Sequence, residues 1–183
     1  NNGRSPSSAM PLAMYEAMEP DTRNETITWL KRLVAEGQSD VRRDRVELVG
    51  LGFHWPNLSL THRLEATLGY NPVRLDRYSR ATGAEDTVGL PEQRKFSPLF
   101  PGYGSMLANL LGLRYIATPV RIETIDKASP EGALRLVAGT REGYIYENPK
   151  ALPRVVFAHL ARPLGDPEQL IATGRWPDFD PLT

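Results

Sequence analysis

The sequence has no cysteine, and it has no long uninterrupted run of apolar residues. The absence of cysteine excludes disulfide bonds, thiolate catalysis and zinc sites with cysteine ligands, but it fits both the cytoplasm and the periplasm. No stretch approaches the ~18 to 20 apolar residues that a membrane-spanning helix needs. The first residues also lack the charged start and apolar core of a signal peptide. As it stands, the sequence predicts a soluble chain without a targeting signal.

The sequence also lacks an excess of charge of either sign. Lysine plus arginine number 22, and aspartate plus glutamate also number 22. A chain so balanced has no overall field that would attract a nucleic acid, so we expect no nucleic-acid partner. The hydrophobic fraction of 40% is ordinary for a folded protein, and the 16 prolines and 15 glycines indicate many turns.

The side chains that carry chemistry form no recognisable motif. His54, His62 and His159 lack the spacing that seats a metal ion on one helix face, so we expect no metal and no other cofactor. The chain has no G-x-S-x-G elbow and no phosphate-binding glycine loop. Glu85 and Asp86 are adjacent carboxylates in an expected loop, where neighbouring side chains usually point apart. The sequence therefore predicts no catalytic residue in this chain.

Helix and strand signals alternate irregularly along the chain. Residues 1–21 hold three prolines and scattered methionines, which predict an irregular N-terminal arm without a stable helix. Thr22 and Glu25 form a T-x-x-E capping box that predicts a helix ending at Gly37. Further helices are expected over residues 60–68, 72–81, 106–111 and 166–174. Strands are expected over residues 45–51, 113–118, 134–138, 144–147 and 154–160.

The connections between these elements complete the expected fold. Residues 53–57 are expected to be a loop because Pro56 disfavours a helix, and residues 84–102 are expected to be a long loop with three prolines. The order of elements predicts that residues 22–183 form a single α/β domain, with a mixed β-sheet of about five strands and flanking helices. An α+β two-layer sandwich, with the helices on one face, is the alternative.

Three stretches of the sequence resemble the YfhO-like family of bacterial polytopic membrane proteins. The first two are Gly69-Tyr70-Asn71-Pro72 and the run from Leu110 to Pro119. The third and most specific is Tyr146-Glu147-Asn148-Pro149-Lys150-Ala151-Leu152-Pro153-Arg154. In this last stretch Pro149 and Pro153 are expected to form a rigid link that delivers Arg154 into the sheet.

The resemblance implies a protein related to the GT-C glycosyltransferases, which take sugars from lipid-linked donors on the outer side of the membrane. The chain would then be an excised extracytoplasmic segment, on the periplasmic or extracellular side, and its polar start and abrupt end fit such an excision. A further β-rich module commonly follows the Leu-Pro-Arg strand in this family, and the chain would stop before it. The expected partners are the protein's own transmembrane domain and a lipid-linked sugar or glycan.

Two functions are expected from this resemblance. In the first, the segment is accessory to lipid-linked sugar transfer and has no independent catalysis, because no part of the chain matches the loop that carries the family's catalytic acid. The candidate sugar contacts are aromatic, amide and basic side chains that suit sugar recognition. They are His54, Trp55, Asn57, Tyr70, Asn71 and Arg77.

In the second function, the chain is a structural or protein-interaction module that contacts no substrate. An exposed apolar patch would favour this alternative. The expected patch is lined by Met10, Met14 and Met18 and by the residues at the C-terminal end of the chain.

Overall fold

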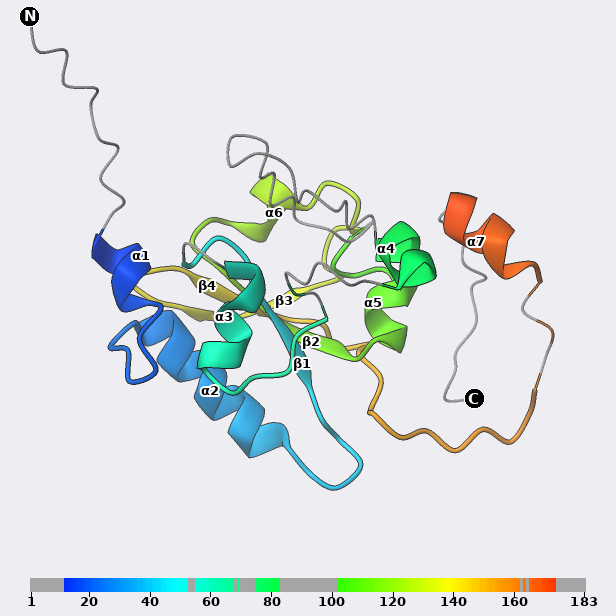
Figure 1. The fold of residues 1–183 in the computed structure, drawn as a ribbon, viewed down its shortest axis with the longest axis horizontal. Helices are drawn as coiled ribbons and strands as arrows, with labels where there is room; N and C mark the ends of the chain where they lie inside the picture. The colour runs from blue at the N-terminus through cyan, green and yellow to red at the C-terminus, as the bar shows by residue number, and fades with distance from the viewer. Residues whose placement is uncertain are drawn as a thin grey trace, which may run out of the picture.

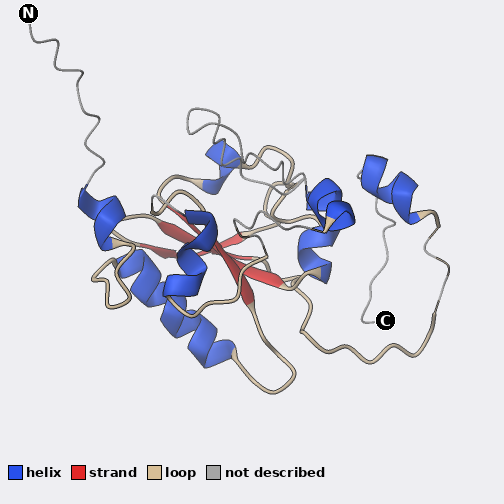
Figure 2. Ribbon diagram, in the orientation of Figure 1, coloured by secondary structure: helices blue, strands red, loops and turns tan. Residues whose placement is uncertain are grey.

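The centre of the structure is one open β-sheet (Figure 1 and Figure 2). This computed structural model describes residues 12–52, 55–67, 69, 75–82, 102–161, 163 and 165–173, without the side chains of residues 55 and 56. The strands lie in the order β1 (Arg45–Leu48), β2 (Leu113–Thr118), β4 (Tyr144–Glu147) and β3 (Arg135–Gly139). β1 and β2 are parallel, and the other two pairs are antiparallel. The expected mixed α/β fold is confirmed, with four strands in the described residues instead of about five.

Helices pack on both faces of this sheet. Successive residues of a strand face opposite sides, so Tyr115 and Ile116 of β2 enter different apolar clusters. On one face, α2 (Glu25–Gly37) buries its apolar stripe against the sheet. On the other face lie α5 (Met106–Leu110) and α6 (Ile122–Ile125). The helices are therefore not gathered on one face, as the two-layer alternative required.

The capping box at Thr22 and Glu25 correctly predicted helix α2, but it indicated the wrong N-cap residue. The N-cap of α2 is Asn24, whose side chain accepts a hydrogen bond from the backbone N–H of Ile27 at 3.0 Å. Thr22, the expected cap, accepts a hydrogen bond from the N–H of Asn24 at 3.1 Å instead. The helix ends at Gly37 as expected.

The structure confirms several helix ends and turns that the sequence predicts later in the chain. Ser105 caps α5 by accepting a hydrogen bond from the N–H of Ala108 at 3.2 Å. Gly112 then turns the chain into β2 with a φ of 68°, a conformation that glycine adopts without steric cost. The hairpin of β3 and β4 and the last helix, α7 (Pro167–Thr173), also lie where the sequence predicts them.

Four helical expectations need correction or completion. The arm contains a short helix, α1 (Leu12–Glu16), where none was expected. α3 (Trp55–Thr61) includes residues 55–57 of the loop expected over 53–57, because Pro56 stands in the first turn, where its missing N–H has no partner to lose. Of the helix expected over 60–68, only residues 60 and 61 are helical, as the end of α3, and residues 62–67 are not. α4 (Asp76–Thr82) overlaps the helix expected over 72–81 and extends one residue past it. α6 had no clear signal in the sequence.

The fifth expected strand does not form. Residues 154–160 have no strand conformation, and their side chains are exposed. Arg154 is not delivered into the sheet; it lies at the surface and forms an ion pair with Glu65. A run of β-branched residues becomes a strand only when a neighbouring strand accepts its hydrogen bonds. Of the long loop expected over 84–102, all but Gly102 lies outside the described residues.

Candidate functional site

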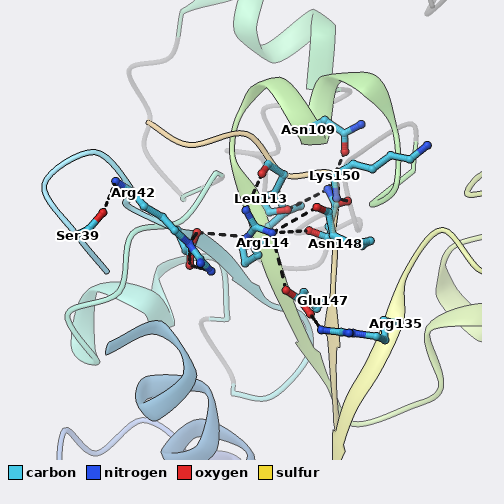
Figure 3. A network of polar contacts seen from close by, with 12 residues as sticks. Ser39, Arg42, Asn109, Leu113, Arg114, Arg135, Glu147, Asn148 and Lys150 are labelled. Atoms are coloured by element: carbon cyan, nitrogen blue, oxygen red, sulfur yellow. Dashed lines mark hydrogen bonds and ion pairs between the residues drawn. The ribbon is translucent and has the colours of Figure 1, made fainter. Parts of the chain in front are cut away.

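The most extensive polar cluster in the described residues surrounds Arg114, near the start of β2 (Figure 3). Three parts of the chain meet there: the segment before β1, the start of β2, and the segment that leaves β4. We call this cluster the Arg114 network. Its members are Arg42, Asp44, Asn109, Arg114, Arg135, Glu147 and Asn148.

The side chain of Arg114 is 13% exposed, and its guanidinium directs N–H groups at protein oxygens. Nε donates to a carboxylate oxygen of Asp44 at 3.4 Å. Nη2 donates to the carbonyl of Ala151 at 2.6 Å, and Nη1 donates to the carbonyls of Asn148 at 3.4 Å and Pro149 at 3.5 Å. The planar fork of arginine thus holds three carbonyls of one short segment.

Asp44 supplies the negative charge that faces Arg114 on one side. Its side chain is 2% exposed, and Arg42 donates to both of its oxygens, with the closest contact at 2.8 Å. The hydrogen bond with Asp44 raises the pKa of Arg42. Gly37 packs against this pair, because a Cβ there would lie 2.9 Å from both Arg42 Nη2 and Asp44 Oδ2. The C-terminal end of α2 therefore packs against the ion pair between Arg42 and Asp44.

Glu147, the last residue of β4, supplies the negative charge on the other side. Its carboxylate lies 3.8 Å from Nη1 of Arg114 and also forms an ion pair with Arg135 of β3. The network therefore contains two carboxylates and three guanidinium groups. Burial of such charges is stable only when they are paired, as they are here.

Asn148 fixes the turn that follows β4. Its amide nitrogen donates to Asn109 Oδ1 at 2.8 Å and to the carbonyl of Leu113 at 3.1 Å. Its amide oxygen accepts a hydrogen bond from the N–H of Lys150 at 3.1 Å. Two residues after Lys150, the backbone N–H of Leu152 donates to the carbonyl of Asn109 at 3.0 Å. Residues 148–152, which we call the exit link, are thus bound to β2 and α5.

These contacts give the Arg114 network a structural role, which is to position the exit link. The N–H groups of Arg114 are directed at carbonyls and a carboxylate of the same chain, so the guanidinium is not presented to an anion from solution. Asn148 likewise uses both ends of its amide within the protein. The network holds the exit link in one conformation and so determines where the chain leaves the sheet.

A second polar cluster lies around Glu47 of β1. This side chain is 3% exposed, and Thr67 donates to its Oε1 through both its backbone N–H, at 3.2 Å, and its hydroxyl. The hydroxyl of Tyr78 in α4 donates to the carbonyl of Thr67. Burial raises the pKa of Tyr78 and the pKa of Tyr103, a residue that is 3% exposed. The negative charge of Glu47 raises both pKa values further. Both phenols therefore stay protonated at neutral pH.

Most of the residues expected to contact a sugar lie outside the described part. His54, Tyr70 and Asn71 lie outside it entirely, and Trp55 begins α3 with its side chain outside it. The side chains of the other two are described: Asn57 is half-buried in α3, and Arg77 is exposed on α4. With only these two side chains described, the structure does not test the expected contact surface, which stays a prediction.

Arg77 has a partner within the chain. Its Nε lies 3.0 Å from a carboxylate oxygen of Glu168 in α7. Arg80, one turn later on α4, also contacts Glu168, at 2.8 Å, and pairs with Asp76. These arginines fasten α4 to α7 at the surface.

The buried acids were not anticipated from the sequence. Asp44 stands among Arg42, Arg43 and Arg45, a pattern that reads as an exposed charged loop. Glu47 stands inside the apolar run of β1, and this interruption was a usable signal, because a charged residue in a buried strand needs a partner. Asn148, directly after a strand and before a proline, is part of the most specific stretch of the family resemblance.

Comparisons with known proteins return no relatives: no family model, no curated protein and no solved structure matches the chain. Within the described ranges, no three histidine or acidic side chains are grouped so that they could hold a metal ion. The same ranges contain no helix with the length and apolar character for crossing a membrane. The resemblance to the YfhO-like family therefore stays a prediction.

Proposed function

We propose that this chain is a non-catalytic interaction module on the extracytoplasmic side of a larger membrane protein, where it docks against that protein's own transmembrane domain. In the terms of the family resemblance, its role is accessory to lipid-linked sugar transfer. The observation that carries the proposal is an exposed apolar segment, residues 155–160, at the end of the exit link.

The exposed segment has the composition of a contact surface. Val155 is 48% exposed, Phe157 is 85% exposed and Leu160 is 63% exposed. Consecutive apolar side chains on a surface mark an interaction site more often than single ones do. The β-branched residues also favour an extended conformation that a partner could complete.

The Arg114 network supports docking because it fixes the origin of this segment. Arg114 binds the carbonyl of Ala151, and Asn109 binds the N–H of Leu152, two residues before the chain reaches Arg154. Arg154 then pairs with Glu65, and the N–H of Val155 donates to the carbonyl of Val41 at 3.3 Å. A segment that starts from a fixed point loses less entropy when it binds than one on a free tail does.

The expected methionine patch does not contribute to this surface in the described residues. Met18 packs against the core cluster beneath α2, and Met14 is half-buried. Met10 lies outside the described residues. The docking surface we propose is therefore the segment 155–160, which follows the exit link, and not the arm.

Substitution of Phe157 tests the proposal. In the full-length protein divided into two polypeptides, this module and the membrane part, we expect Phe157→Asp to reduce co-purification of the two at least tenfold. The melting temperature of the module alone should change by no more than about 2 °C, because an exposed side chain contributes little to folding. Leu75→Asp is the matched control, since Leu75 is 78% exposed and lies away from this segment in the sequence. Unchanged co-purification of the Phe157 variant would contradict the proposal.

A further inference from the structure

The N-terminal arm, residues 12–21, is held to the rest of the protein by few buried groups. Its helix α1 buries no residue. Ala17 is fully buried in the core cluster beneath α2, and Met18 lies close to Gly52 and Leu58. An element with so little buried surface can open without unfolding the domain.

One buried histidine bonds directly to this anchor. His62 follows α3, is 3% exposed, and places its Nε2 2.8 Å from the carbonyl oxygen of Ala17. A carbonyl oxygen only accepts hydrogen bonds, so Nε2 carries the proton. Nδ1 is then the unprotonated nitrogen, and it is buried without a hydrogen-bond partner in the described part of the chain.

We propose that the hydrogen bond between His62 and Ala17 is a pH-sensitive latch, which holds the arm while the imidazole is neutral and releases it when Nδ1 is protonated. The latch is independent of the proposed docking function. It rests on the position of Nδ1, where an added proton would meet neither water nor an acceptor in the described residues. A buried cation without a partner is costly, so the protonated imidazole favours the solvated, released state.

The charged groups around His62 do not offset this cost. Lys31 of α2 lies near enough to act on the imidazole, and its positive charge opposes protonation. The arm's carboxylates, on Glu16, Glu19 and Asp21, are solvent-exposed, and so is Arg63 beside the histidine. Burial lowers the pKa of His62 most strongly, the bond to Ala17 opposes this effect, and Lys31 lowers the pKa further.

The lowered pKa of His62 determines how docking of the arm depends on pH. In the released state the imidazole is solvated and its pKa is about 6.5. In the docked state the pKa is lower, so docking is fully favoured above about pH 6.5 and weakens as the pH falls below that value. If the docked imidazole stays neutral at pH 5.5, the docking equilibrium falls about tenfold between pH 7.5 and 5.5.

Hydrogen exchange of the arm, measured by NMR and corrected for the intrinsic pH dependence of exchange, tests the latch. The N–H of Ala17 bonds to the carbonyl of Ala13 at 3.0 Å, so its protection reports arm opening. We expect this protection to fall up to about tenfold from pH 7.5 to 5.5, while the amides of β2 and β4 keep theirs.

Two glutamine variants separate the latch from a general effect of pH. His62→Gln keeps an N–H donor for the Ala17 carbonyl and removes the titrating group, so its arm should stay protected at pH 5.5. His159→Gln is the matched control, because His159 is exposed, and it should behave like the natural protein. Equal loss of protection in all three proteins would overturn the proposal.

An independent readout covers the case in which His62→Gln does not fold. Direct NMR titration of the His62 ring in the natural protein should give a pKa below 6.5 while the arm is docked. A docked ring that titrates at or above 6.5, or arm protection that does not change between pH 7.5 and 5.5, would overturn the latch.

Discussion

At the scale of single residues, Arg114 has the central structural role. Its guanidinium joins a buried carboxylate before β1 to three carbonyls after β4, so one side chain links segments that are far apart in the sequence. Lysine carries the same charge but is a single point donor, and it cannot reproduce the planar fork. The shape of the side chain therefore matters here as much as its charge.

Replacement of Arg114 by lysine should destabilise the protein. We expect Arg114→Lys to lower the free energy of unfolding by about 2 kcal/mol or more, because the carbonyls of the exit link, two of them partly buried, lose their donor. Urea denaturation measures the change. Arg141→Lys is the matched control, since Arg141 is 76% exposed and pairs with its neighbour Glu142, and its effect should stay within about 0.5 kcal/mol. Equal stabilities of the two variants would show that the network does not hold the exit link.

Residue-level features were the hardest to predict from the sequence. The burial of Asp44 depends on which segments come together, and nothing in the neighbouring residues specifies this. The position of Glu47 inside an apolar strand indicates that it is buried, but it does not identify Thr67 as its partner. The N-cap of α2 was also not predictable from the sequence, although the candidate residues lie close together in the chain. Thr22 and Asn24 are both good N-caps, and the sequence pattern alone favoured the wrong one.

At the scale of elements, local signals predicted what local interactions stabilise. Ser105 and Gly112 bracket α5 as expected, and residues 139–143 turn the chain between β3 and β4. The prediction for residues 154–160 was wrong because a strand needs a partner, and partner choice is not a local property. The sequence therefore predicted the hairpin but not the number of strands.

The β3–β4 hairpin offers a sharp test of packing in the sheet. A Cβ at Gly143 would lie 2.4 Å from the carbonyl oxygen of Thr118 and 3.1 Å from Cα of Pro119, both backbone atoms that cannot turn aside. We expect Gly143→Ala to lower the free energy of unfolding by about 1–3 kcal/mol. Gly139→Ala, at the other end of the same turn, has only Tyr144 within reach, at 3.9 Å, and should be tolerated. Thermal unfolding of both variants measures the difference, and equal melting temperatures would contradict this packing.

At the scale of the whole molecule, the two proposed functional features lie at opposite ends of the parallel strands. The exit link binds near the start of β2, whereas Met18 of the arm contacts Gly52, which follows the end of β1. Residues between them belong to β1 and β2, which are buried at all but one position each. Release of the arm should therefore leave the exit link in place.

The central claim is that this chain lies on the extracytoplasmic side of a membrane protein, and labelling of one introduced cysteine tests it most directly. The chain has no cysteine of its own, so Arg141→Cys adds a single exposed thiol within it. The full-length protein, with and without this change, would be treated in intact cells with a maleimide that cannot cross the cytoplasmic membrane. We predict that the introduced thiol is labelled as fully in intact cells as after permeabilisation. Labelling only after permeabilisation, or a parent protein without membrane spans, would contradict the account.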